Sequence, residues 1–477
     1  MQDQSSLADP SKRLIDDSAS KRVPLREKLA FAIGALPDMI GFHTPKNLAN
    51  PIFNVILGVN PVLIGTAIAI TRVWDALIDP TVAAVSDNTR GRFGRRRPFL
   101  VVGAIVSGIA FAGMWHIPAG LSENGYFLFI LVAMMLFYTV FSVFTVPYHA
   151  IGYEMTTDYH DRTRVMSFRL FFNHVGLVAV GWVFAATQLP IFDDTLDGVK
   201  WMGLFLGIAI VLLGIVPGVF LKEKTLVVAR KQKAVPVLSS VRQAFQNRGF
   251  AILLAMAFLH VTATNIASTF ALYVNIYYVY DGDIKGAAVI QGWGGTIGHV
   301  GAMLMLPIIS SHSLAIGKRG LLRVGLIALV LGSLSKWIFY NPEQPYLQLI
   351  SVLILSFSSI AFWLMVQSMI GDVCDEEQYR LGVRREAMFG ALLTWVQKIG
   401  ISLGYVAAGL LLVQVGFDQA LGKGQDSGTI FWFRVIFSLL PMLVGLLLVA
   451  MLSFYPLTEI RIREIRKELD SREREVN

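Results

Sequence analysis

The sequence predicts an all-α integral membrane protein of about twelve transmembrane helices, arranged as two six-helix bundles around a central cavity. Of its 477 residues, 55% are hydrophobic and only 16% are charged, whereas soluble domains have roughly 25% charged residues. The mean hydropathy is +0.59, and many apolar runs reach the ~20 residues that a helix needs to cross a bilayer. Soluble enzymes, nucleic-acid-binding proteins and disulfide scaffolds are therefore poor interpretations.

The apolar runs give the predicted helices in order. We expect crossings near 29–57, 60–86, 98–118, 125–150, 168–189, 201–221, 249–278, 286–311, 320–340, 346–371, 387–415 and 429–455. Prolines inside the first run predict bends, whose freed backbone groups must be satisfied by neighbouring helices or by a watery cavity.

The charge of the connections predicts the topology. Basic residues gather at 90–97, 162–164, 222–248, 318–319 and 380–385, and the alternate connections are nearly free of them. The positive-inside rule places the basic set and both termini in the cytoplasm. We expect a tail at 1–28, a first bundle at 29–221, a linker at 222–248, a second bundle at 249–455 and a tail at 456–477. The first 28 residues lack the apolar core of a signal peptide, and an inner-membrane location is the expectation for a bacterial source.

Several function classes lack their signals. The net charge of +8 comes from basic residues between apolar runs, so it indicates topology rather than a nucleic-acid partner. A single cysteine, Cys374, excludes an internal disulfide and a thiolate cluster. Phosphate-loop, HExxH and serine-nucleophile motifs are missing. We therefore expect no enzyme activity and no cofactor, and transport driven by an ion gradient.

Two acidic side chains lie inside the predicted second span. Asp75 and Asp79 are four residues apart and share one helix face. Each buried charge costs at least about 2.5 kcal/mol on insertion scales, and two adjacent carboxylates hold a proton or share a cation. We interpret them as a coupling site for a proton or for sodium, with both aspartates as metal ligands in the sodium case. The alternative is that Arg72, one turn earlier, neutralises the pair.

The predicted eleventh span carries a lysine far from either end. Thr394 and Lys398 lie one turn apart, and a lysine that cannot reach the interface needs an acidic partner. If spans two and eleven face each other, Lys398 competes with a cation for Asp75 and Asp79. A fixed structural salt bridge is the alternative. Trp395, on the same helix, is a candidate substrate contact.

Further polar residues are candidates for binding a solute. Arg169 opens the fifth span among aromatic residues, where a guanidinium can bind hydroxyls or an anion as a rigid fork. His149 closes the fourth span, and a hydrogen-bonded structural histidine is the commoner alternative there. Asp38 in the first span and Asn265 in the seventh are further lining candidates.

Charged residues in two connections predict gating contacts instead of ligands. The candidates are Asp161, Arg162, Arg164 and Arg384. Acidic and basic groups at the cytoplasmic ends of helices can form salt bridges that open and close as two bundles move.

These motifs resemble a known family. WDALIDP, NTRGRFGRRRP, VPYHAIGYEMT, FRLFFN and GDVCDEEQYRLGVRREAMFGALLTWVQKIG occur in the order and on the spans of the glycoside-pentoside-hexuronide:cation symporters. These are melibiose permease-like proteins of the major facilitator superfamily. The resemblance covers nearly all the chain. It implies the major facilitator fold, with Asp75, Asp79, Ser142, Thr394 and Lys398 at the cation site, and Arg169 at the sugar site.

The sequence departs from that family at three informative positions. Ile78 replaces an asparagine of the sodium-using relatives, which removes an oxygen that a hard cation wants. Thr145 replaces an acidic galactoside-binding residue, and His149 replaces a tryptophan that stacks on sugar. The loss of the oxygen at position 78 therefore favours proton coupling over sodium coupling. Loss of an acid near Arg169 favours an anionic solute such as a uronide or a sulfonated sugar.

Two alternatives stay open at this point. A related branch of lysolipid symporters shares the paired aspartates and the lysine, and its substrates need an apolar cleft open to the bilayer. A receptor that does not transport is the other alternative, although it has no need for a buried cation pair. We expect a monomer whose partners are a small solute and the bilayer.

Overall fold

The computed structural model describes residues 23–89, 93–156, 159–221, 246–382 and 386–476, and the part described is all helical. The predicted all-α fold is confirmed. The tail up to residue 22, the linker at 222–245 and Arg384 lie outside the described residues.

The first half begins with an interrupted crossing. It consists of α2 (Leu25–Ile33), α3 (Ala35–Ala49) and the π-helix η1 (Asn50–Ile56). A Cβ on Gly34, between α2 and α3, would lie 2.6 Å from the Tyr148 ring, so the close passage of this aromatic ring requires a glycine there. The other helices of this half are α4 (Pro61–Asn88), α5 (Arg97–Met114), α6 (Glu123–Glu154), α7 (Tyr159–Ala186) and α8 (Thr195–Phe220).

The second half repeats this plan. It contains α10 (Arg248–Tyr273) with η3 (Val274–Val279), α11 (Ile284–Phe339), α12 (Gln348–Leu381), α13 (Glu386–Gln414) and α14 (Ser427–Ser453). The long α11 includes two predicted crossings, because the chain turns at Gly317, where φ is +70°. A polar helix, α15 (Glu459–Val476), follows.

Eleven helical segments of the described chain are long and apolar enough to cross a membrane. The first predicted crossing is not among them because it is divided into α2, α3 and η1. Taken together with that divided crossing, the segments match the twelve predicted from the apolar runs.

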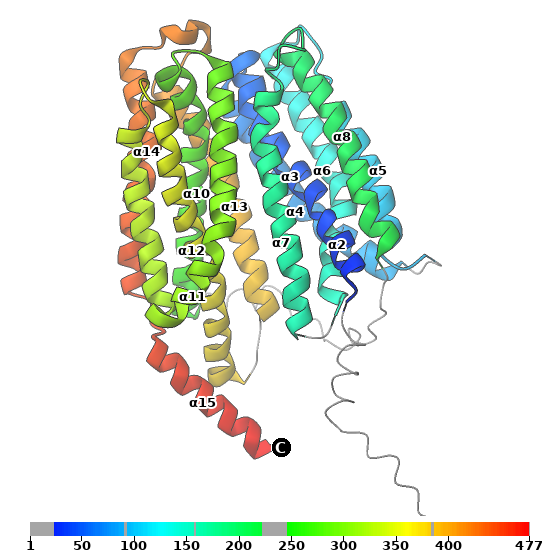
Figure 1. Cartoon of the computed structure of the whole chain (residues 1–477), viewed down its shortest axis with the longest axis vertical. Coiled ribbons are helices and arrows are strands. Elements are labelled where there is room, and N and C mark those ends of the chain that lie inside the picture. The colour runs from blue at the N-terminus through cyan, green and yellow to red at the C-terminus, as the bar shows by residue number, and fades with distance from the viewer. Residues whose placement is uncertain (1–22, 90–92, 157–158, 222–245, 383–385, 477) are drawn as a thin grey trace, which may run out of the picture.

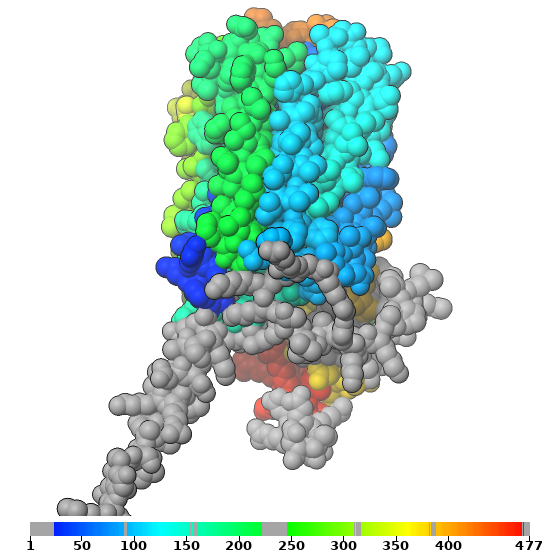
Figure 2. All heavy atoms as spheres, turned by 90° about the vertical axis from the view of Figure 1, so that its right-hand side faces the viewer, coloured from blue at the N-terminus to red at the C-terminus, as the bar shows by residue number. Residues whose placement is uncertain are grey.

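Small residues let helices of one half approach closely. The helices α5 and α8 run side by side along the outer face of the first half (Figure 2). A Cβ on Gly207 would lie 2.5 Å from the carbonyl oxygen of Gly108. Close backbone contact of this kind replaces the missing hydrophobic driving force between helices in lipid.

The two halves are joined at one end. The helices α2 to α8 form one group and α10 to α14 the other, and the groups separate toward the end that carries α15 (Figure 1). At the opposite end a continuous apolar core contains residues of both halves, such as Phe53 and Phe270. The hydroxyl of Tyr273 donates a hydrogen bond of 2.7 Å to Asn54 Oδ1 across this junction. A second core belongs to the second half alone.

Candidate cation and substrate sites

Two helices of different halves bring the predicted coupling residues together. Lys398 Nζ on α13 donates hydrogen bonds to Asp75 Oδ2 at 3.1 Å and to Asp79 Oδ2 at 3.0 Å on α4. Ser142 Oγ on α6 donates to Asp79 Oδ1 at 2.8 Å. The cluster therefore ties α4, α6 and α13 at a point where the two halves meet.

Glycines set the contact between α4 and α13. A Cβ on Gly65 would lie 2.5 Å from the carbonyl oxygen of Tyr405, and one on Gly409 would lie 2.5 Å from that of Pro61. Neither backbone can retreat cheaply, so both positions need glycine. This close packing fixes the two helices on which Lys398 and the aspartates stand.

Arg72 contributes charge without direct hydrogen bonding. Its side chain is 1% exposed, and its Nη1 lies 3.9 Å from Asp75 Oδ2. The guanidinium lies 4.1 Å from the ring centroid of Tyr138 and 4.7 Å from that of Phe42, and its nitrogens have no hydrogen-bond partner. Aromatic faces attract a cation held in this way. With both aspartates ionised, Lys398 and Arg72 bring the local charge to zero.

Two predicted residues of α13 lie apart from the aspartates and the polar cavities. Thr394 is exposed and donates its hydroxyl hydrogen bond to Gly390 O of its own helix at 3.0 Å. Trp395 is 56% exposed and lines an apolar groove of about 620 Å³ between α4 and α13. Both residues lie about one turn before Lys398 on the same side of α13, but the Thr394 hydroxyl bonds to its own helix and Trp395 shares the apolar groove with Lys398.

A second cluster surrounds Asp38 on α3. His149 Nε2 lies 2.9 Å from Asp38 Oδ2, and Arg169 Nη2 donates to the same oxygen at 3.4 Å. Arg169 also lies 5.4 Å from the ring centroid of Tyr148. The absence of an acid at Thr145 therefore does not leave Arg169 without a carboxylate, because Asp38 supplies one.

Two further candidates, Thr145 and Asn265, donate side-chain hydrogen bonds to carbonyl groups of their own helices. Thr145 Oγ1 donates to Phe141 O at 3.2 Å. Asn265 Nδ2 donates to Val261 O at 2.8 Å. Such local bonds to the preceding turn are common for these side chains.

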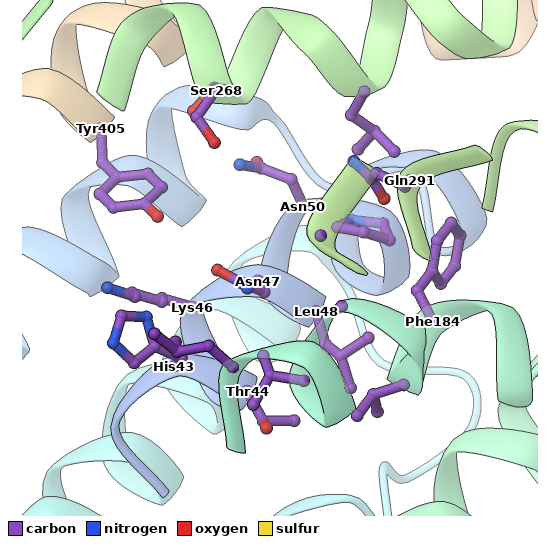
Figure 3. Close-up of a pocket in the computed structure, with 18 of the residues that line it drawn as sticks. His43, Thr44, Lys46, Asn47, Leu48, Asn50, Phe184, Ser268, Gln291 and Tyr405 are labelled. Carbon is purple, nitrogen blue, oxygen red and sulfur yellow. The ribbon is translucent and has the colours of Figure 1, made fainter. Parts of the chain in front are cut away.

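A polar chamber of about 360 Å³ lies between the halves. Lys46 and Asn47 of α3 and Asn50 of η1 face Ser268 and Tyr405 across it (Figure 3). None of its described lining residues carries a carboxylate. We name it the central chamber.

Lys46 is the functional candidate that sequence reasoning missed. It is 8% exposed, and its Nζ lies 4.7 Å from the ring centroid of Phe42. The ion pairs of the described residues do not include it. The signal that identified Lys398, an ionisable residue inside an apolar span, applies equally here. The central chamber therefore has a buried lysine on its wall and no carboxylate among its described lining residues.

The structure describes the side chains of two of the four predicted gating residues, Asp161 and Arg164. Asp161 accepts hydrogen bonds from Lys28 Nζ and, at 2.6 Å, from the backbone amide of Val23. Burial alone would raise the pKa of Asp161, but these donors and the Lys28 charge outweigh burial, so its pKa lies below the usual value. Arg164 is exposed and its charge contributes to the same effect. The side chain of Arg162, like Arg384, lies outside the described residues.

Ion pairs at the α15 end join elements within one half. Arg96 Nη1 lies 2.8 Å from Glu154 Oε2 in the first half. In the second half, Asp372 pairs with Lys318 at 2.7 Å and with Arg466 at 3.3 Å. None of these three ion pairs joins one half to the other.

Comparison with known proteins identifies the family. The family model described as MFS/sugar transport protein matches residues 30–459. The chain belongs to this family. It is therefore a multi-pass membrane transport protein and not an enzyme, and the resemblance predicted from the motifs is confirmed.

Relatives cover almost the whole chain. An uncharacterised symporter of Bacillus subtilis strain 168, YnaJ, is 24% identical over 95% of this chain and 96% of its own. A glucuronide carrier protein homologue of Escherichia coli K12 is 22% identical over 93% of both chains. The fold is similar to the crystal structure of a bacterial homologue of the human lysosomal transporter Spinster in an inward-facing, unoccupied conformation. The TM-score is 0.65 at 14% identity, over 96% of this chain and 98% of that one.

Proposed function

We propose that this protein is a cation-coupled symporter of an acidic sugar derivative, a uronide or a sulfonated sugar, that works by alternating access. The observation that carries the proposal is the position of Lys398 between Asp75 and Asp79. A lysine from one half that neutralises two acids of the other half can be displaced by a cation. Its displacement changes the electrostatic attraction between the halves.

A proton fits this site better than sodium does. The oxygens that converge on it come from Asp75, Asp79 and Ser142. Ile78 offers none, and the Thr394 hydroxyl donates to its own helix. Hard cations prefer several oxygen ligands, whereas a proton needs one carboxylate and the release of Lys398.

The central chamber supports an acidic solute. Its volume of about 360 Å³ lies in the range of small-molecule sites. Lys46 offers a cation without a carboxylate of the described residues beside it, and the amides and hydroxyls of Asn47, Asn50 and Tyr405 can bind sugar hydroxyls. One relative is named a glucuronide carrier homologue, and a glucuronide combines those two chemical features.

The arrangement of the halves supports an alternating-access cycle. The shared apolar core closes the end with Tyr273 and Asn54, and the groups separate at the α15 end (Figure 1). We assign the α15 end and both termini to the cytoplasm from the basic connections, in a bacterial inner membrane. In this assignment 29–221 and 249–455 are the two moving bundles and 222–248 links them.

The test is transport by proteoliposomes that contain the full chain. We expect labelled uronide or sulfonated sugar to accumulate inside, in the absence of sodium, when pH falls on the solute side. Uptake is measured rather than current, because one proton carried with one monovalent anion moves no net charge. Uptake that requires sodium would reject proton coupling, and uptake of neutral glycosides only would reject the acidic solute.

A second candidate function, symport of a lysolipid, is favoured by the groove between α4 and α13. The groove between α4 and α13 is lined almost wholly by apolar side chains, with Lys398 and Arg72 on its wall. A lysolipid could place its chain there and its phosphate near these cations. A response of the proteoliposomes to lysolipid alone would favour this candidate over the sugar symporter.

A further inference from the structure

A second polar cavity lies inside the second half, between α10, α11, α12 and α14. Its volume is about 300 Å³, and we name it the serine chamber. Ser268 lines both the serine chamber and the central chamber, so the two cavities are neighbours. The serine chamber uses none of the residues assigned above to the cation site or to the Asp38 cluster.

A buried lysine, Lys336, lines the serine chamber. Lys336 is 7% exposed, and its Nζ donates a hydrogen bond of 3.1 Å to Phe437 O. It also lies 4.0 Å from the ring centroid of Phe437. An ammonium group has three donors, and only one of them is used by this carbonyl. None of the described lining residues carries a carboxylate.

The nearby charged group is also a cation. Arg434 of α14 donates to Trp337 O at 3.3 Å and lies 4.4 Å from the Trp337 ring centroid. It does not line the serine chamber. Arg434 is therefore no anionic partner for Lys336, and none of the described lining residues is one, so an anion is the species that would balance a protonated Lys336.

Three buried polar groups in the serine chamber lack partners. Ser333 Oγ, Ser358 Oγ and His260 Nδ1 have no hydrogen-bond partner. Their residues are 0%, 1% and 3% exposed. Buried polar atoms are nearly always hydrogen-bonded in folded proteins. Ser333 and Ser358 line the same chamber as Lys336, and two hydroxyl donors with a lysine form a donor set that suits an anion.

We propose that the serine chamber binds a small monovalent anion, with Lys336 as its cationic ligand and the hydroxyls of Ser333 and Ser358 as donors. The anion is a halide or the carboxylate or sulfonate group of an organic acid. A site of this kind is independent of the coupling chemistry at Lys398. It gives the second half an anion-binding position next to the central chamber.

Thermal unfolding of the purified full-length protein in detergent tests this proposal. The midpoint is followed while sulfate, a divalent anion, is replaced by bromide, by acetate or by methanesulfonate at constant pH and ionic strength. We expect a saturable rise in at least one series, because a ligand that binds only the folded state stabilises it. A rise with bromide alone assigns the site to inorganic halide, and a rise with acetate or methanesulfonate assigns it to an organic acid group.

The variants assign the effect to the serine chamber. We expect Lys336→Gln to raise the half-saturating anion concentration about tenfold or more. The matched control, Lys285→Gln, removes an exposed lysine of the same half that does not line the chamber, and should keep the wild-type value. If Lys336→Gln does not fold, Ser358→Ala serves, with an expected increase of about threefold to tenfold. A linear response of the wild type, or equal half-saturation in the wild type and the chamber variant, would overturn the proposal.

Discussion

Removal of Lys398 should affect both the stability of the protein and its coupled uptake, because this lysine joins the aspartates of the first half to the second half. It neutralises Asp75 and Asp79 at 3.1 and 3.0 Å. Loss of one partner from a buried ion pair leaves uncompensated charge and costs up to about 3–5 kcal/mol. Because these side chains are partly exposed, we expect Lys398→Gln to lower the free energy of unfolding by about 1–3 kcal/mol, measured by chemical denaturation.

The double variant provides the control for that substitution. Adding Asp79→Asn to Lys398→Gln removes one of the unpaired acids, and stability should be partly restored. Uphill uptake should stay abolished in both variants. Full additivity of the two stability losses would contradict a direct interaction between these residues.

The contacts of Asp161 with Lys28 and Val23, at the α15 end of the first half, give a prediction about pH dependence. Its pKa lies below the ordinary value of 3.8, so its stabilising contacts are complete above that pH and disappear as pH falls through the lower folded value. Between pH 5 and 8 the contact with Lys28 should not titrate. Asp161→Asn should lower the hydrogen-exchange protection factors of α2 throughout that range, and an equal loss of protection in the wild type on going from pH 8 to 5 would contradict this assignment.

Individual residues also show how much of the candidate site could be predicted from the sequence. Asp75, Asp79 and Lys398 were found because ionisable groups are costly inside apolar spans. Lys46 and Lys336 satisfy the same criterion and were missed, since they lie near span ends or beside prolines in the sequence. Thr394 shows the limit of spacing, because a hydroxyl in a helix can bond to its own preceding turn.

At the scale of elements, the contact between α4 and α13 depends on glycine. We expect Gly65→Ala to destabilise the protein by about 1–3 kcal/mol and to reduce coupled uptake, because its Cβ would meet Tyr405 O at 2.5 Å. The matched control is Gly390→Ala on α13, where a Cβ meets nothing within 4 Å. It should change stability by less than about 1 kcal/mol. Equal effects at both positions in unfolding and uptake assays would reject the close-packing explanation.

Helix boundaries could be predicted where length and hydropathy determine them. The predicted span 60–86 corresponds to Pro61–Asn88, and 429–455 corresponds to Ser427–Ser453. The predicted 29–57 is instead three helices, because the break at Gly34 depends on the distant Tyr148 ring. The end of α12 at Leu381 also exceeds the predicted 346–371, since polar turns extend the helix past the apolar run.

At the scale of the whole molecule, alternating access requires that the halves separate at one end and then at the other. The shared core with Tyr273 and Asn54 closes one end. We expect Tyr273→Phe to weaken that closure and to shift the population toward the state open there. Distances between spin labels on η1 and η3 should then increase in a larger fraction of molecules, and an unchanged distribution would contradict a role for this bond.

The coupling claim is tested most directly by one comparison in proteoliposomes. Wild-type protein and Asp79→Asn are each given an acidic sugar with an inward proton gradient and without sodium. We expect accumulation above the external concentration by the wild type, and only equilibration or exchange by Asp79→Asn. Accumulation by Asp79→Asn equal to that of the wild type would contradict the assignment of Asp75, Asp79 and Lys398 as the coupling site.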